Sequence, residues 1–196
     1  MTATPDQVNA YPSLITALCE RDLCTRSHCD RVCALAAEVG CAAGLRATDL
    51  EALRIASQLH DIGKIGVRDN VLLKPGKLTN DEWEEMKAHS IYGERIIKDT
   101  FLSNKAAVAL IVRHHHEAFD GTGYPDGLAS KEIPQSCRIL SIVDRYDAMT
   151  TRRPYHGARS HDEAMDILAK EAGTKVDPES FAVFSKVIAI SSALVP

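Results

Sequence analysis

The sequence lacks long apolar runs and an excess of positive charge. No stretch of its 196 residues approaches the roughly 18 uninterrupted apolar residues that span a bilayer. The N-terminal sequence MTATPDQVNAYPSL has no basic-then-apolar pattern of a secretory signal. A net charge of −4 gives no basic surplus for a nucleic-acid polymer. We therefore predict a cytoplasmic protein that binds neither a membrane nor a nucleic-acid polymer.

Cysteine is present without the spacing of a zinc ribbon or a redox motif. No CxxC pair occurs among Cys19, Cys24, Cys29, Cys33, Cys41 and Cys137. Cys29 and Cys33 are four residues apart, as neighbours on one helix face are, and cysteine is readily buried. Packing is therefore the favoured role, and disulfides are not expected in a reducing cytoplasm.

Strand signals are nearly absent and no internal repeat is found, whereas signals for helix starts recur. The segments 48–51, 79–82 and 160–163 each begin with Ser or Thr and end with Glu. In such a capping box, the hydroxyl and the carboxylate satisfy backbone N–H groups that a helix start leaves unpaired. Asp177-Pro178 predicts another start, because the carboxylate can cap and proline suits the first helical position.

Apolar residues recur at steps of three and four, which predicts an all-α fold. A chain of 196 residues can form one sizeable core but is short for two ordinary domains. We predict a single-domain bundle of about seven or eight helices. Their expected ranges are 8–21, 25–42, 49–62, 80–98, 103–117, 134–150, 161–172 and 178–192. Residues 67–78 and 120–134 are expected to form loops, and the second is long and Gly-rich, as functional loops often are.

Histidine and aspartate stand next to each other where the predicted helix 49–62 ends. Neighbouring residues on a helix point about 100° apart, so His60 and Asp61 can hold two different metal ions with the carboxylate between them. A single His-Asp pair is more often a surface hydrogen bond or a helix cap. The other histidines favour the metal site.

Three consecutive histidines follow an apolar helix, at 114–116. They cannot all face solvent, and at least one should point inward, where metal or hydrogen bonds would satisfy it. Asp144 ends another apolar run and needs a partner, for which a cation is suited. Mixed nitrogen and oxygen ligands favour Fe, Mn, Zn or Co over Mg or Ca. A metallohydrolase with a site built from several helices is therefore indicated.

The separated motifs together resemble the HD-GYP domain. They are His28, His60-Asp61, His89, the run HHEAFDGTGYP at 115–125 and DRYDAMTTRRPY at 144–155. HD-GYP domains are the branch of the HD phosphohydrolases that hydrolyses cyclic di-GMP in bacteria. The resemblance is strongest over 21–181. It implies that 1–196 is one HD-GYP domain with an HD-type helical bundle and no separate regulatory domain.

The resemblance also implies roles for individual residues. The implied metal ligands are His28, His60, Asp61, His89, His115, His116 and Asp144. Asp61 and Lys64 would be catalytic, with Lys64 on the scissile phosphate. The implied substrate-binding residues are Lys64, Gly123, Tyr124, Pro125, Asp147, Arg153 and His156. The family motif has two histidines before its glutamate, so counting back from Glu117 leaves His114 with no implied role.

Three positions depart from the family pattern. Cys24 stands where some members have a glutamate that binds a third metal, so two divalent ions are expected. Fe or Mn is preferred, and Zn, Co and Ni also fit. His156 replaces a basic residue, which predicts a weaker or pH-dependent phosphate contact. Ala118 replaces another basic residue, and the sequence assigns no consequence to that change.

The function implied by the resemblance is hydrolysis of cyclic di-GMP to linear pGpG by metal-activated hydroxide, with a slower second cut to GMP as a further step. One alternative is a cyclic-dinucleotide sensor, or a module that docks onto signalling proteins through the loop that contains Gly123, Tyr124 and Pro125 (the Gly-Tyr-Pro loop). Another is a hydrolase whose substrate is a different cyclic dinucleotide or a nucleotide monophosphate.

Overall fold

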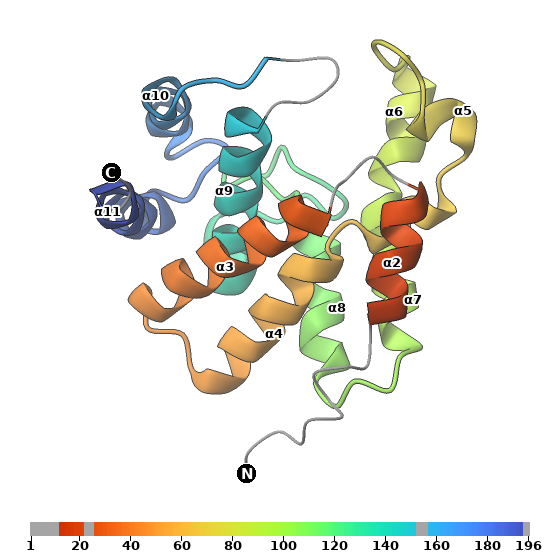
Figure 1. The fold of residues 1–196 in the computed structure, drawn as a ribbon, viewed down its shortest axis with the longest axis horizontal. Coiled ribbons are helices and arrows are strands. Elements are labelled where there is room, and N and C mark those ends of the chain that lie inside the picture. Colours follow the sequence, from red (N-terminus) through yellow and green to blue (C-terminus); the bar gives the residue numbers. More distant parts are fainter. Residues whose placement is uncertain (1–11, 22–25, 152–156, 194–196) are drawn as a thin grey trace.

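Helices form all the regular secondary structure of the described residues, as the sequence predicted. The computed structural model describes residues 12–21, 26–151 and 157–193. Figure 1 shows the elements, with short 3-10 helices labelled η in the text. They are α2 (Pro12–Arg21), α3 (Arg26–Ala42), α4 (Ala47–Leu59), η1 (Ile62–Gly66), α5 (Asp69–Leu72), α6 (Asn80–Lys87), α7 (His89–Lys98), α8 (Lys105–His114), η2 (Ser130–Glu132), α9 (Gln135–Thr150), α10 (His161–Glu171) and α11 (Pro178–Ala193).

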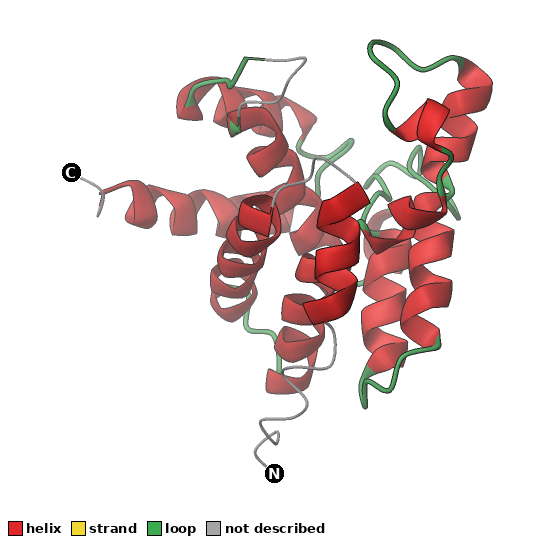
Figure 2. Cartoon of the chain, turned by 45° about the vertical axis from the view of Figure 1, so that its right-hand side comes forward, coloured by secondary structure: helices red, strands yellow, loops and turns green. Residues whose placement is uncertain are grey.

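The centre of the fold is a group of helices that bury apolar faces against one another. Helix α4 packs against α3, α8 and α9, while α7 packs against α8 and η1. Helices α10 and α11 lie against α9, on the side of the molecule away from α6 and α7, as Figure 1 labels them and Figure 2 shows from a second direction. Leu53, Leu59, Val112, Ile139 and Leu140 are fully buried in this core. Among the described helices, none is both long and apolar enough to cross a bilayer.

Most helix boundaries follow the local sequence signals. The helices predicted at 25–42, 134–150, 161–172 and 178–192 are confirmed to within one residue at each end. The capping box that starts α6 is also confirmed: Glu82 N donates to Thr79 Oγ1 at 3.3 Å, and Thr79 N donates to Glu82 Oε2 at 2.7 Å. The box that starts α10 at Ser160 has the same reciprocal bonds.

The predicted box at 48–51 was wrong. Helix α4 begins at Ala47 with Arg46 as its N-cap residue, and no side chain caps it. The Arg46 guanidinium instead bonds the Asp49 carboxylate at 2.8 Å. The helix therefore starts before the threonine that the pattern pointed to.

The observed helices differ from the predicted ones near His89 and near the histidine run 114–116. The range 80–98 is divided at Ala88, where the Met86 carbonyl accepts a bond from the His89 ring. Residues 67–78, predicted as a loop, contain the short α5. The predicted helix 103–117 ends at His114, because the chain turns there and Glu117 N donates to the His114 carbonyl. Part of the predicted helix 8–21 lies outside the described residues.

Gly63 lets α7 approach η1 closely. A Cβ atom on Gly63 would lie 1.7 Å from the His89 carbonyl oxygen and 2.4 Å from Gly93 N. Both are backbone atoms, so the clash cannot be relieved by a side-chain rotation. This contact places the start of α7 beside Asp61.

We predict that Gly63→Ala lowers the free energy of unfolding by about 1–3 kcal/mol, because the added methyl group forces packed backbone apart. Chemical denaturation measures the change. Gly157→Ala is the matched control, since its Cβ would meet nothing within 4 Å. Equal stability of the two variants would contradict the close approach.

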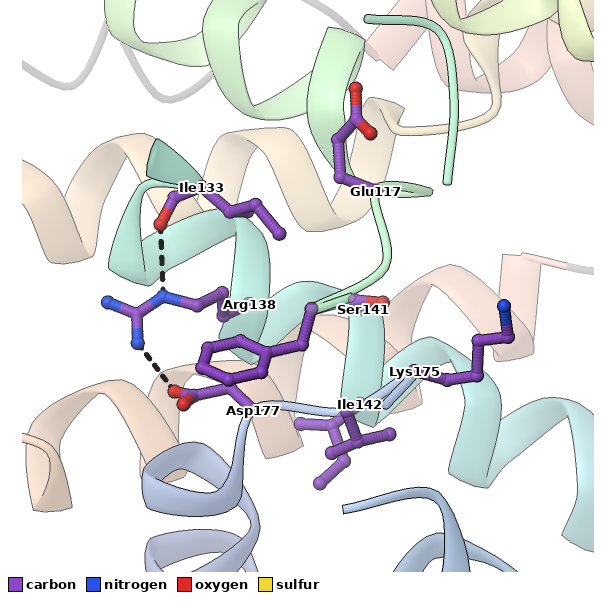
Figure 3. Close-up of a pocket in the computed structure, with 9 residues that line it drawn as sticks. Glu117, Ile133, Arg138, Ser141, Ile142, Lys175 and Asp177 are labelled. Atoms are coloured by element: carbon purple, nitrogen blue, oxygen red, sulfur yellow. Dashed lines mark hydrogen bonds and ion pairs between the residues drawn. The ribbon is translucent and has the colours of Figure 1, made fainter. Parts of the chain in front are cut away.

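A buried ion pair joins α9 to the start of α11. Arg138 Nη1 lies 2.5 Å from Asp177 Oδ2, and the Arg138 Nε donates to the Ile133 carbonyl at 3.0 Å (Figure 3). Asp177 also caps α11, because Ser180 N and Oγ donate to its carboxylate. The small cavity that these residues line has room for about one water molecule, which excludes a nucleotide.

We predict that Asp177→Asn destabilises the fold by about 3 kcal/mol or more at neutral pH, because it leaves the Arg138 charge buried without its partner. Burial raises the pKa of Asp177, but Ser180 and Arg138 outweigh it and lower the pKa overall. The ionised Asp177 therefore stabilises the fold at pH values above its pKa in the unfolded chain. This stabilisation is lost as the pH falls through the lower pKa that Asp177 has in the folded protein.

The difference between wild type and variant should consequently narrow below about pH 4, as measured by denaturant unfolding at several pH values. Glu179→Gln, an exposed change in the first turn of the same helix, serves as the control. A difference that is independent of pH would argue against an ionised Asp177.

Candidate metal centre

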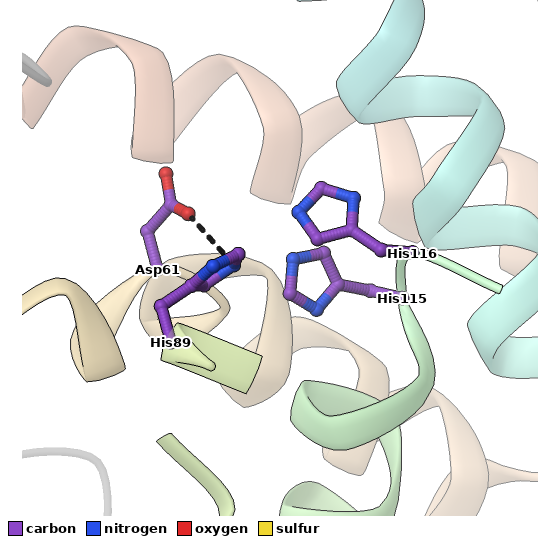
Figure 4. Close-up of side chains that lie close together, drawn as sticks. All are labelled: Asp61, His89, His115 and His116. Carbon is purple, nitrogen blue, oxygen red and sulfur yellow. Dashed lines mark ion pairs between the residues drawn. The ribbon is translucent and has the colours of Figure 1, made fainter. Parts of the chain in front are cut away.

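The structure brings all seven predicted metal ligands into one cluster. His28 comes from α3, His60 and Asp61 follow the end of α4, and His89 begins α7. The pair His115-His116 lies in the turn after α8, and Asp144 projects from α9. Ring centroids are 5.1–5.6 Å apart along the series His28, His60, His115, His89 and His116, and those of His115 and His116 are 3.9 Å apart. Figure 4 shows Asp61, His89, His115 and His116 facing a common space.

Backbone carbonyls orient three of these imidazoles in the same way. The Nδ1 atoms of His60, His89 and His115 lie 2.9, 2.7 and 2.7 Å from the carbonyl oxygens of residues 57, 86 and 112. Each Nδ1 donates, so each Nε2 is the ring atom that faces the cluster, and in a neutral ring it carries a lone pair. All three Nε2 atoms are buried and have no hydrogen-bond partner. Buried acceptors without partners are costly, and a bound cation would satisfy them.

Asp61 lies between two groups of potential ligand atoms. One group combines Asp61 with His89, His115 and His116, and the other combines it with His28 and His60. Within each group, one ligand atom from each residue lies within 4.8 Å of all the others. The Oδ2 atom of Asp61 is 3.5 Å from His60 Nε2, and its Oδ1 atom is 3.7 Å from His89 Nε2. A carboxylate so placed can bridge two ions.

Asp144 faces the same space from α9. Its Oδ1 atom lies 3.5 Å from His28 Nε2 and 3.6 Å from His60 Nε2. Burial raises the pKa of Asp144, but His60 outweighs it, and the pKa falls well below its ordinary value. The carboxylate is therefore ionised at neutral pH.

The protonation of the histidines is uneven. Burial lowers the pKa of His89 and His115, and it brings the pKa of His116 down to about 3. Burial also acts against a charged His60, but Asp61 and Asp144 outweigh it and raise the pKa of His60 to about 10. The Nε2 atom of His60 therefore carries a proton at neutral pH, and a metal ion that binds there would displace this proton. The ionised Asp61 and Asp144 and the neutral rings of His89, His115 and His116 supply oxygen and nitrogen atoms of the kind that bind transition-metal ions.

Lys64 is the cation beside the cluster. Its Nζ lies 2.8 Å from Asp61 Oδ2, and its side chain keeps partial contact with solvent. Burial raises the pKa of Asp61, but Lys64 and the nearby histidines lower it well below the ordinary value. The Asp61 carboxylate thus stays charged.

Asp147, which the resemblance placed among substrate-binding residues, lies behind His28. Its Oδ2 is 2.6 Å from His28 Nδ1, and Arg31 bonds both carboxylate oxygens at 2.6 and 2.9 Å. Burial raises the pKa of Asp147, but His28 and Arg31 lower it to about 2. This arrangement can hold the His28 ring so that its Nε2 faces Asp144.

The Gly-Tyr-Pro loop closes over the histidine pair. The Tyr124 ring lies 4.9 Å from the His116 ring, tilted by 34°. Gly123 has no room for a side chain, since a Cβ atom would lie 2.2 Å from Ala118 N. The Tyr124-Pro125 peptide bond is cis. The loop therefore places Tyr124 beside the cluster by close backbone packing.

A polar network anchors the far end of this loop to α8. Arg113 bonds both oxygens of Asp126 at 2.7 Å, and His114 Nε2 lies 2.8 Å from Asp126 Oδ2. Glu117 accepts a bond from Asp126 N at 2.8 Å. His114, which had no implied role, thus contacts the loop. Arg113 already supplies the positive charge that a cation would bring there.

The sequence did not point to these supporting residues. Arg31 is 116 residues from Asp147, and no local pattern links them. Asp126 directly follows Tyr124-Pro125, so its place beside the motif was the only available signal. Cys24, Arg153 and His156 lie outside the described residues.

Comparison with known proteins decides the family. A family model described as "HD domain" matches residues 11–180. The chain belongs to the HD-domain family. The predicted HD-GYP assignment is confirmed. HD-domain phosphohydrolases are metal-dependent, in agreement with the His/Asp cluster.

Two curated relatives are equally similar in sequence to this HD domain. The cyclic di-GMP phosphodiesterase of Thermotoga maritima is 39% identical over 85% of the chain and 45% of its own length. The cyclic di-GMP phosphodiesterase response regulator RpfG of Xanthomonas campestris pv. campestris is 39% identical over 84% of the chain and 44% of its own length. The chain thus spans less than half the length of these relatives.

Solved structures share the fold at low sequence identity. A cyclic GMP-AMP specific phosphodiesterase of V. cholerae (V-cGAP3) has a TM-score of 0.72 at 20% identity, covering 94% of this chain and 48% of that one. The PgpH HD domain of L. monocytogenes, in complex with cyclic-di-AMP, has a TM-score of 0.66 at 15% identity. The match covers 94% of this chain and 98% of that one. The HD-type helical fold is therefore confirmed.

We predict that Arg31→Gln weakens metal binding about tenfold or more, because Asp147 then holds His28 less firmly. The measurement is the concentration of Mn²⁺ that raises the thermal unfolding temperature of chelator-treated protein. Arg95→Gln, an exposed change on α7, is the control. If the variant and the wild type need the same Mn²⁺ concentration to raise the unfolding temperature, Arg31 does not support metal binding.

Proposed function

We propose that the chain is a metal-dependent phosphodiesterase that hydrolyses cyclic di-GMP to linear pGpG, with a slower second cut to GMP. One observation carries this proposal: three buried Nε2 atoms without partners converge with Asp61 and Asp144 beside Lys64. The names of the two 39% identical relatives support cyclic di-GMP as the substrate. A cytoplasmic location stays a prediction from the sequence.

We propose two divalent ions as cofactors, with Fe or Mn preferred and with Zn, Co and Ni as other candidates. The first would be held by His89, His115 and His116 together with Asp61. The second would be held by His28, His60 and Asp144, again with Asp61. Bound ions would polarise the phosphate and lower the pKa of water.

Asp61 and Lys64 are the proposed catalytic residues. The ionised Asp61 can accept a hydrogen bond from the attacking water and so orient it. Lys64, 2.8 Å from that carboxylate, can donate to a phosphate oxygen on which negative charge develops. Their contact also keeps the ammonium group directed at the cluster.

Tyr124 is the proposed donor from the Gly-Tyr-Pro loop. Burial raises the pKa of its phenol, and Asp61 and Asp144 raise it further, so the hydroxyl keeps its proton at neutral pH. It can then donate a hydrogen bond to the substrate, while Gly123 and Pro125 shape the loop. Arg153 and His156 remain predicted phosphate contacts.

Asp147 acts in this proposal through His28. Its carboxylate is occupied by Arg31 and His28, so we assign it to positioning of the ring in place of substrate contact. This revises the role that the resemblance implied. His28 would then meet the second ion with a fixed orientation.

Another cyclic dinucleotide is the second candidate substrate. The 3'3'-cGAMP-specific phosphodiesterase 3 of Vibrio cholerae is 38% identical over 84% of the chain. Its name makes 3'3'-cGAMP the alternative to test first. A sensor or docking module is less favoured, because none of the predicted ligands is replaced.

We predict that Lys64→Ala lowers kcat on cyclic di-GMP about 100-fold or more, because the developing phosphate charge loses its donor. Asp61→Asn should lower it at least as far. Protein purified without oxygen and loaded with Fe or Mn is the sample, and chromatography of pGpG and GMP is the measurement. Lys186→Ala, an exposed lysine change on α11, is the control.

Absence of cyclic di-GMP cleavage by the metal-loaded wild type with Fe, Mn and Co would overturn the proposed reaction. Faster cleavage of 3'3'-cGAMP than of cyclic di-GMP would replace the substrate and keep the reaction class. Retained binding without cleavage of any cyclic dinucleotide would favour the sensor.

A further inference from the structure

Trp83 is a large aromatic side chain left open to solvent near the metal centre. It is the single tryptophan of the chain, and 46% of it is exposed. It projects from α6, whose start is secured by the Thr79 capping box. An exposed indole on a well-anchored helix can stack on a planar ligand.

A series of ring contacts connects Trp83 to the histidine cluster. The Trp83 ring meets the Tyr124 ring edge to face, with centroids 6.1 Å apart and an angle of 83°. Tyr124 in turn lies against His116 at 4.9 Å and His89 at 6.4 Å. Trp83 is therefore two ring contacts from the proposed metal ligands and stands at the rim of the site.

Lys87 lies one helical turn after Trp83, on the same face of α6. Its Nζ stands 5.9 Å from the centre of the Tyr124 ring. The face of α6 that carries Trp83 and Lys87 is thus directed toward the Gly-Tyr-Pro loop. The two residues and Tyr124 define one continuous surface at the rim.

The charges of α6 favour a neutral ligand group at this rim. Its acidic residues are Asp81, Glu82, Glu84 and Glu85. Lys74, Lys87 and Arg68 pair with Glu82, Glu84 and Glu85, which leaves no excess of positive charge. A phosphate would therefore gain little here, whereas a planar uncharged ring can stack on an indole face.

We propose that Trp83 is a stacking platform for one purine base of the substrate, an inference that rests on the proposed phosphodiesterase function. A cyclic dinucleotide carries its bases outward from the phosphate ring. When the scissile phosphate lies at the histidine cluster, one base extends toward the rim, where Trp83 offers its exposed face. Trp83 contributes to binding of the substrate and leaves the chemistry at the metal centre unchanged.

The single tryptophan makes the contact directly observable. Tryptophan fluorescence of the metal-loaded protein, followed before turnover, should fall to a saturable limit as cyclic di-GMP is added. Cyclic di-AMP and 3'3'-cGAMP are titrated in parallel, because each also carries purine bases. No change with any of the three ligands would overturn the platform.

Kinetics of variants tests the role independently. Trp83→Ala should raise KM for the cleaved dinucleotide about tenfold, with kcat within about twofold of wild type. Trp83→Phe keeps an aromatic face, and its KM should stay within about threefold of wild type. Phe101→Ala is the matched control, since Phe101 is fully exposed and lies beyond the opposite end of α7.

The outcomes separate this inference from the proposed function. Saturable quenching without cleavage would support the platform and contradict the phosphodiesterase. Cleavage with an unchanged KM in Trp83→Ala would overturn the platform and leave the phosphodiesterase intact. Equal losses in the alanine and phenylalanine variants would also overturn it, because stacking requires only an aromatic face.

Discussion

The fixed orientation of the imidazole rings is the constraint on which the site depends. Backbone carbonyls at 57, 86 and 112 hold the Nδ1 atoms of His60, His89 and His115. Each of these carbonyls lies three residues before its histidine, near a helix end, where helical bonding no longer claims every carbonyl. Helix ends therefore leave these carbonyls free to accept a bond from the rings, and the held rings of His60 and His89 turn their Nε2 atoms toward Asp61.

Asp61 unites the two halves of this arrangement. The residue follows His60 after the end of α4, at the turn into η1, and its two oxygens face different histidines. Close packing at Gly63 brings α7 and His89 within reach of one oxygen. The α8 turn and Gly123 bring His116 and Tyr124 to the same space. The departures from regular helix thus occur where the cluster needs side chains to converge.

Local signals account for much of the fold. Capping boxes at Thr79 and Ser160 and the Asp177-Pro178 start were read correctly, because each depends on residues within one helical turn. The box at Thr48 failed, because helical bonding starts earlier: Leu50 N donates to the Arg46 carbonyl at 2.9 Å, which places Thr48 inside the first turn. The break at Ala88 was also missed. It depends on the His89 ring and on the approach of Gly63, which lies far away in the sequence.

The sequence by itself determined the all-α class, most helix boundaries and the residue types of the cluster, because periodicity, caps and motifs are local. Tertiary structure alone decided which atoms meet. It turned Asp147 toward Arg31 and His28, placed His114 on the loop anchor and set Trp83 at the rim. These contacts join residues that are separated by 12 to 119 positions, and only the packing of distant helices creates them.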